Sequence, residues 1–158
     1  MPIGALIIMV RFNIVITPFL LILAGFGMML TGCATSKPVT SDSIKTEMAA
    51  IIRDITADRT VMNSLRERRV GKTGFYYILD ADARVIFHPR QALIGTSFSK
   101  TWFVTQMLTR KNGCLTYTLG NRIHFLFFSP INDSEILCLS IVSEDLPRPV
   151  ECEPARVR

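Results

Sequence analysis

The chain has 158 residues, of which 49% are hydrophobic, and it carries 18 lysines and arginines against 13 aspartates and glutamates. This length predicts a single domain. The charges are interspersed apart from a basic cluster at residues 66–69, RERR, which is typical of a solvated helix end and is also open to attraction by anionic lipid head groups. A nucleic-acid interface needs a stripe of basic side chains with stacking aromatics, so we expect no nucleic-acid partner.

The N-terminal segment has the features of an export signal. Seventeen uncharged residues, Ile14–Leu30, follow Arg11 and precede small residues, which is the pattern of a secretory signal peptide. Seventeen residues also reach the lower limit for a membrane-spanning helix. The sequence LTGC at residues 30–33 resembles the lipobox of bacterial lipoprotein precursors, and this motif favours the signal peptide.

The lipobox resemblance implies that residues 1–32 are a signal peptide and that the thiol of Cys33 receives a diacylglycerol. The alternative is a free cysteine at the end of an uncleaved anchor helix. Initiation at Met9 instead of Met1 would give a more ordinary signal peptide. With either a lipidated Cys33 or an uncleaved anchor helix, we expect a domain that is anchored at the cell membrane and faces the periplasm or the cell exterior. A flexible tether at residues 33–42 joins this domain to its anchor.

A long amphipathic helix is predicted next. Apolar residues recur after Ser43 at spacings of three, four and seven, namely Ile44, Met48, Ile51, Ile52, Ile55, Met62 and Leu65. The pattern predicts one helix of roughly 25 residues, about 38 Å long, with Gly71 as its stop. The apolar stripe of this helix must pack on another element.

Aromatic and β-branched segments separated by turns predict a sheet. The five segments are residues 75–81, 84–89, 114–119, 122–131 and 135–142. A shorter helical pattern that includes Trp102 and ends at Gly113 lies between the second and third segments. The order of elements predicts an α+β domain in which the long N-terminal helix packs on a five-stranded antiparallel sheet.

The sequence GKTG at residues 71–74 begins like a phosphate-binding loop. Such a loop needs a further glycine five positions before its Gly-Lys-Ser/Thr, and a helix after it. Arg66 occupies the earlier position, and a strand pattern follows the motif. We therefore predict that the two glycines shape the chain and bind no phosphate.

Residues 71–99, GKTGFYYILDADARVIFHPRQALIGTSFS, resemble the core signature of Cache domains, the PAS-like extracellular sensor modules of bacterial chemoreceptors and sensor kinases. The parts of this signature are Gly-x-x-Gly, an aromatic strand, an acidic turn, a strand ending in His-Pro and a later glycine. Residues 112–131 also fit the family pattern, and the resemblance spans residues 43–143 in all. It implies a single Cache-like domain at residues 43–145, with the shorter helix over the ligand face.

The sequence departs from the family in two respects. Ala83 stands where the hairpin commonly has glycine, so we expect a turn that needs no positive φ at that residue. No second membrane helix or cytoplasmic signalling segment follows, so we do not expect a transmembrane receptor. The Pro-rich, charged residues 146–158 predict a disordered tail.

The resemblance implies a small ligand, which is an amino acid, a carboxylate or an amine, between the concave face of the sheet and the segment linking the second and third strands. Such a pocket needs an apolar wall and a few polar groups. The candidate ligand-binding residues are Tyr77, His88, Trp102, Tyr117 and His124. Each has a structural alternative, because His88 can cap its turn and the others can pack in the sheet or the core.

No catalytic signature stands out, and the two histidines and remaining cysteines show no zinc-ligand spacing. We therefore expect no enzyme activity, no cofactor and no bound metal. Besides Cys33 the chain has Cys114, Cys138 and Cys152. A PAS-like strand order separates the strands of Cys114 and Cys138, which leaves buried thiols or an intermolecular disulfide through Cys152.

The predicted function is extracytoplasmic sensing by an exported lipoprotein. The protein is attached to the membrane through Cys33, binds a small-molecule ligand and presents the liganded state to a membrane receptor or transporter partner. The alternative is a ligand-free scaffold or protein-interaction lipoprotein on the same fold, whose pocket is filled by its own side chains. The presence or absence of a cavity discriminates between the two.

Overall fold

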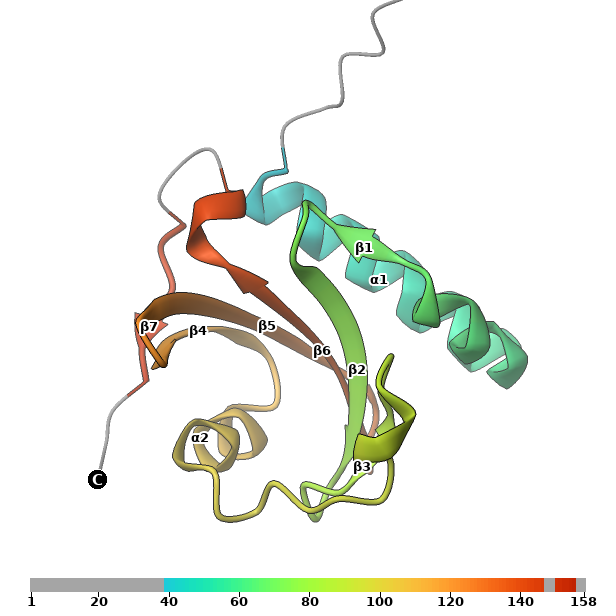
Figure 1. Ribbon diagram of the computed structural model, residues 1–158. Helices are drawn as coiled ribbons and strands as arrows, with labels where there is room; N and C mark the ends of the chain where they lie inside the picture. The colour runs from blue at the N-terminus through green and yellow to red at the C-terminus, as the bar shows by residue number, and fades with distance from the viewer. Residues whose placement is uncertain (1–38, 147–149, 156–158) are drawn as a thin grey trace, which may run out of the picture. The chain divides into compact units, whose positions relative to one another are not determined.

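The computed structural model of the chain describes residues 39–146 and 150–155. The predicted signal peptide, the Cys33 lipidation site and most of the predicted tether lie outside these residues. Within them, no helix has the length and apolar character needed to cross a membrane. The described residues form an α+β fold with helices on both faces of a mixed sheet (Figure 1).

The first helix, α1 (Ser41–Ala57), begins at a capping box. The Thr40 hydroxyl accepts a hydrogen bond from the Ser43 N–H at 3.1 Å, and the Ser43 hydroxyl accepts one from the Thr40 N–H at 2.9 Å. The buried face of the helix consists of Ile44, Met48, Ile51 and Ile55. This face agrees with the apolar stripe that the sequence predicts.

The prediction of one uninterrupted helix is wrong, because α1 ends at Ala57 after 17 residues. Asp58 is extended, and its carboxylate accepts a hydrogen bond from the Thr60 N–H at 2.9 Å. This cap starts a separate 3₁₀ helix, Arg59–Arg66. Aspartate favours such local bonds over a helix interior. Gly71 therefore does not end a helix and lies in the turn after the first strand.

The described residues contain a sheet of seven strands, and the five predicted strands are among them. The strands are β1 (Arg69–Val70), β2 (Gly74–Asp80), β3 (Val85–Phe87), β4 (Gly113–Leu119), β5 (Arg122–Asn132), β6 (Glu135–Val142) and β7 (Glu153–Pro154). They follow the order β1-β2-β6-β5-β4-β7, with β3 paired to β2. The five predicted strands pair antiparallel, as predicted, whereas β7, which was not predicted, runs parallel to β4 and makes the whole sheet mixed. β5 separates β4 from β6, as a PAS-like order requires.

Side-chain alternation divides the residues of the central strands β2, β5 and β6 between two hydrophobic cores. Tyr76 and Ile78 of β2 belong to the core beneath α1, whereas Tyr77 and Leu79 belong to the core beneath the second helix, α2 (Trp102–Arg110). Because both faces are covered, β2, β5 and β6 contain runs of buried residues instead of strict alternation. α2 thus lies over the face that the sequence predicts to bind a ligand.

The turn between β2 and β3 contains a residue in an unfavourable conformation. Ala83 has a φ of 61°, so the expectation of a turn without positive φ at this position is wrong. That conformation costs an alanine about 1–2 kcal/mol. The Asp80 carboxylate offsets part of this cost, because it accepts hydrogen bonds from the N–H groups of Asp82 at 2.9 Å and Arg84 at 2.8 Å.

The turn at residues 71–73 binds an internal carboxylate. The N–H groups of Lys72 and Thr73 donate to Oδ2 of Asp145 at 2.9 and 2.6 Å, and the Thr73 hydroxyl donates to the same oxygen at 2.7 Å. Gly71 has a φ of 60°, and a Cβ there would lie 3.1 Å from the Asp145 Cβ. Burial opposes the charge of Asp145, but these hydrogen bonds outweigh it and lower the pKa of the carboxyl below its ordinary value.

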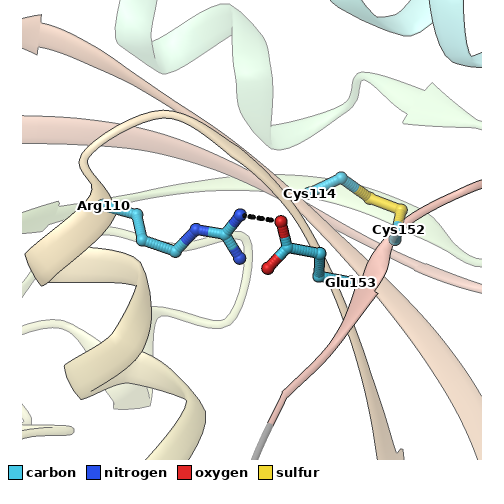
Figure 2. The surroundings of a disulfide bond; sticks show 4 residues. All are labelled: Arg110, Cys114, Cys152 and Glu153. Carbon is cyan, nitrogen blue, oxygen red and sulfur yellow. Dashed lines mark ion pairs between the residues drawn. A yellow bond between two sulfur atoms is a disulfide. The ribbon is translucent and has the colours of Figure 1, made fainter.

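The prediction of a disordered tail is wrong for residues 150–155, which we call the strap. β7 of the strap pairs with β4, and a disulfide joins Cys152 to Cys114 with 5.0 Å between their Cα atoms (Figure 2). The cysteines are separated by 38 positions in the sequence, so the cross-link stabilises the fold by about 4 kcal/mol in the chain-entropy estimate. The predicted intermolecular disulfide through Cys152 is therefore wrong, whereas Cys138 is a buried free thiol.

Replacing Asp145 with alanine is expected to destabilise the protein by about 1–3 kcal/mol, because the turn at residues 71–73 loses a charged acceptor. Urea unfolding at pH 7 measures this loss. The folded-state pKa of Asp145 is lowered, so its contribution is present above the ordinary value of 3.8 and is lost as the pH falls further. The two proteins should therefore approach each other in stability below pH 3.8.

The matched control for this prediction is Glu144→Gln at the neighbouring position. Glu144 pairs with Arg122 at 3.6 Å between side chains that are 59% and 53% exposed. An exposed pair of this kind contributes about 0–1 kcal/mol. Equal losses in Asp145→Ala and Glu144→Gln would contradict the assigned role of Asp145.

Candidate functional site

Two of the five predicted ligand-binding residues lie together on the α2 face. The ring centroids of Tyr77 in β2 and His88 after β3 are 5.9 Å apart. The ring centroid of Phe75 lies 5.2 Å from that of His88. His88 is 7% exposed, and its Nδ1 accepts a hydrogen bond from the Arg90 N–H at 2.9 Å. His88 therefore makes the turn-capping bond that its structural alternative predicts.

The other three predicted residues belong to a row of packed rings that runs from α2 to β5. Trp102 packs edge-on against Phe103 with ring centroids 5.7 Å apart. Phe103 in turn stacks on Tyr117 at 4.1 Å. Tyr117 stacks on His124, its cross-strand partner in β5, at 5.2 Å. Phe103 therefore occupies a face of Tyr117 on which a ligand would otherwise stack.

The buried hydroxyl of Tyr117 and the buried thiol of Cys138, both beneath α2, have partners within the protein. The Tyr117 hydroxyl lies 3.0 Å from the Ser140 hydroxyl, and Tyr77 interacts with the Cys138 thiol. Tyr77 and Tyr117 are each 6% exposed. Burial raises the pKa of both phenols and of the Cys138 thiol, so all three stay protonated at neutral pH. This part of the sheet face is packed with the protein's own side chains.

A pocket of about 530 Å³ lies between α2 and the strap. It is lined by Trp102, Thr105, Gln106, Thr109, Arg110, Glu153 and Pro154. The α2 residues recur at spacings of three and four, which places them on one face of the helix. Trp102 is the member of the predicted set that lines this pocket. Helical spacing around Trp102 indicates its α2 neighbours, whereas no local pattern indicates the strap residues.

An ion pair crosses the pocket from α2 to β7. Arg110 Nη2 lies 2.8 Å from Glu153 Oε1, and Figure 2 shows the two side chains pointing toward each other beside the disulfide. The side chains are 33% and 71% exposed, so water screens their attraction and the pair contributes about 0–1 kcal/mol. Both charged groups can therefore exchange this partner for a bound molecule at little cost.

A second pocket, of about 420 Å³, lies on the α1 side of the sheet. It is lined by Lys45, Met48, Ala49, Asn112, Gly113, Phe127, Phe128 and Ser129. Its charged lining residue is a lysine, so it lacks the unlike charges of the pocket beside the strap. Within residues 39–146 and 150–155, no group of three or more His, Cys, Asp or Glu side chains is placed to hold a metal ion.

No family model matches the chain, and no curated protein matches it either. Among solved structures, the periplasmic sensor domain of a chemotaxis protein has a TM-score of 0.49 and 14% identity, over 65% of this chain and 92% of that one. The ligand-binding domain of Mlp24 with asparagine has a TM-score of 0.44 and 18% identity, over 55% of this chain and 35% of that one. The ligand-binding domain of the Pseudomonas fluorescens chemoreceptor CtaA with L-alanine has a TM-score of 0.40 and 22% identity, over 55% and 38%.

These similarities are distant, since the three identities lie between 14% and 22%. This chain spans less than two fifths of the Mlp24 and CtaA domains, of which it covers 35% and 38%. Asparagine and L-alanine are ligands of those two proteins. The candidate site of this chain is therefore judged from its own geometry.

The stability of the protein should fall as the pH drops from 7.5 to 5.5, because burial and the charge of Arg90 lower the pKa of His88. The unfolded chain then binds the proton more readily than the folded one, so stability is lost as the pH falls through about 6.5, the ordinary histidine value. His88→Asn keeps an acceptor for the Arg90 N–H and does not titrate. Thermal unfolding across this pH range should show a flatter dependence for the variant.

His124→Asn is the matched control for the His88 prediction. Burial and the nearby Arg122 charge also lower the pKa of His124, but this ring is more exposed than that of His88. We expect His124→Asn to remove a smaller part of the pH dependence. A His88→Asn variant that keeps the full wild-type dependence would refute the assignment.

Proposed function

We propose that this chain is an exported sensor-type domain that binds a small molecule, an amino acid, a carboxylate or an amine, in the pocket between α2 and the strap. The observation that carries the proposal is the lining of this pocket, which combines an indole, two threonine hydroxyls and two unlike charges. The volume of about 530 Å³ lies within the range of small-molecule sites.

The charged groups supply a simple mode of recognition. A ligand carboxylate accepts hydrogen bonds from the Arg110 guanidinium, and a ligand ammonium donates to the Glu153 carboxylate. An apolar ligand side chain then lies against Trp102. Because the Arg110–Glu153 pair is exposed, its replacement by these contacts costs about 0–1 kcal/mol.

The location outside the cytoplasm is supported by the disulfide between Cys114 and Cys152, because such bonds persist in oxidising compartments. The lipobox-like sequence at residues 30–33 supports attachment of the protein to the cell membrane through Cys33. In this proposal a membrane receptor or transporter is the partner that detects the liganded domain.

A ligand-free interaction domain is the second candidate, and one specific observation favours it. Phe103 stacks on Tyr117 at 4.1 Å, and Tyr77 is 6% exposed, so side chains fill the sheet face that the sequence predicts to bind a ligand. This filling supports a domain without a ligand on that face. The two candidate functions therefore differ in whether the pocket beside the strap binds a ligand.

The first test is a thermal-shift screen of the purified, oxidised protein with amino acids, short carboxylates and amines. A ligand at one hundred times its Kd should stabilise the fold by about 2.7 kcal/mol, which is a shift of several degrees in Tm. Trp102→Ala and Arg110→Gln should each abolish the shift, because they remove the apolar wall and the cation of the pocket.

Arg122→Gln is the matched control, because it removes the same charge from an exposed pair outside the pocket. It should respond to the ligand like the wild-type protein. A panel that gives no shift favours the ligand-free candidate. A shift that survives Arg110→Gln but is lost in Tyr117→Phe places the ligand on the sheet face and contradicts the proposed site.

A further inference from the structure

The strap contacts the rest of the fold through a short strand pairing, single polar contacts and the packing of Val150 and Ala155 against the two cores. Its strand pairing involves Glu153 and Pro154, and the proline has no N–H to donate to β4. The Ala155 N–H donates to the Thr116 carbonyl at 2.8 Å. The Arg110–Glu153 ion pair adds an exposed contact at 2.8 Å. Each of these interactions is weak compared with a covalent bond, so the disulfide is the strongest single attachment of the strap.

The disulfide and the pocket are joined through consecutive residues of the strap. Cys152 packs with Cys114 against the α1-side core, whereas Glu153 lines the pocket beside α2. Because side chains alternate along an extended chain, fixing Cys152 directs Glu153 toward α2. Figure 2 shows this arrangement, with the disulfide beside the Arg110–Glu153 pair.

We propose that the Cys114–Cys152 disulfide is a redox switch of the ligand pocket, which is complete in the oxidised protein and loses its strap wall when a thiol reductant cleaves the bond. The control of ligand binding rests on the proposed function of this pocket, whereas release of the strap does not. Both cysteines are half-buried and neither is fully buried, which is compatible with attack by a small thiol on the folded protein.

The chemistry requires an external thiol as reductant. A thiolate of the reductant attacks one sulfur of the disulfide, which forms a mixed disulfide and releases the other cysteine as a thiolate. A second reductant thiolate attacks the mixed disulfide and leaves as the oxidised reductant dimer. The two cysteine thiolates each take up a proton, so two electrons and two protons are transferred in total.

Cys138 does not replace the external reductant. Its side chain is fully buried on the α2 side of the sheet, with its sulfur 3.3 Å from the Met107 sulfur, whereas the disulfide belongs to the α1 side. The sheet therefore separates this thiol from the disulfide. Burial also raises the pKa of Cys138, which disfavours the thiolate needed for attack.

The only tryptophan of the chain, Trp102, lies in the pocket wall opposite the strap and reports on its release. Treatment of the purified oxidised protein with reduced glutathione or dithiothreitol should shift Trp102 emission to longer wavelength and increase its quenching by acrylamide. Amide exchange measured by mass spectrometry should accelerate about tenfold or more in residues 150–155, with β2, β5 and β6 unchanged. Far-UV circular dichroism should stay the same.

Two variants serve as controls for the switch. The double variant Cys114→Ser with Cys152→Ser should show the released signals without reductant and should not respond to it. Cys138→Ala should behave like the wild-type protein. Unchanged Trp102 emission and strap exchange after titration of two new thiols would overturn the proposal, and so would loss of the circular dichroism signal on reduction.

The same samples separate this inference from the proposed function. In the thermal-shift screen, a ligand of the pocket should stabilise the oxidised wild-type protein, and its Kd should rise at least tenfold in the double cysteine variant. Release of the strap without any ligand response in the oxidised protein contradicts the proposed function alone. A ligand response of equal strength in both redox states contradicts the switch alone.

Discussion

Burial of the central strands on both faces is the constraint on which the rest of the structure depends. β2, β5 and β6 lie between a core beneath α1 and a core beneath α2. A buried polar atom in this layer is stabilised by a partner inside it, as the Tyr117 and Ser140 hydroxyls are at 3.0 Å. The sheet face is therefore poorly suited to exchange partners with solvent, and groups that can do so lie where β4 meets the strap.

Where β4 meets the strap, the free-energy contributions of the disulfide and the ion pair show which contact holds the strap more strongly. The disulfide contributes about 4 kcal/mol by the chain-entropy estimate, whereas the exposed Arg110–Glu153 pair contributes about 0–1 kcal/mol. The covalent bond can thus keep Glu153 in place while the ion pair itself stays free to exchange. The disulfide fixes one face of the strap, and the exposed ion pair on the other face is weak. This combination is compatible with a binding site.

The predictions from sequence succeed and fail for identifiable reasons. The buried stripe of α1 follows from helical periodicity, and the five predicted strands follow from aromatic and β-branched segments separated by turns; both are present. The apolar spacing does not reveal the break at Asp58, because there a capping carboxylate competes with the continuing helix. The absence of glycine conceals the positive φ of Ala83, because the two hydrogen bonds that the Asp80 carboxylate accepts offset part of its cost.

By itself, the sequence determined the order of the two main helices and the five predicted strands, together with the apolar face of each helix, because periodicity and turn residues are properties of neighbouring positions. Only the tertiary structure decided that Cys152 pairs with Cys114, that the Asp145 carboxylate binds the turn at residues 71–73, and that the strap forms the second wall of the pocket. The disulfide joins positions 38 apart, and the Lys72–Asp145 hydrogen bond joins positions 73 apart. Such contacts depend on how the folded sheet brings distant segments together, and no local pattern encodes them.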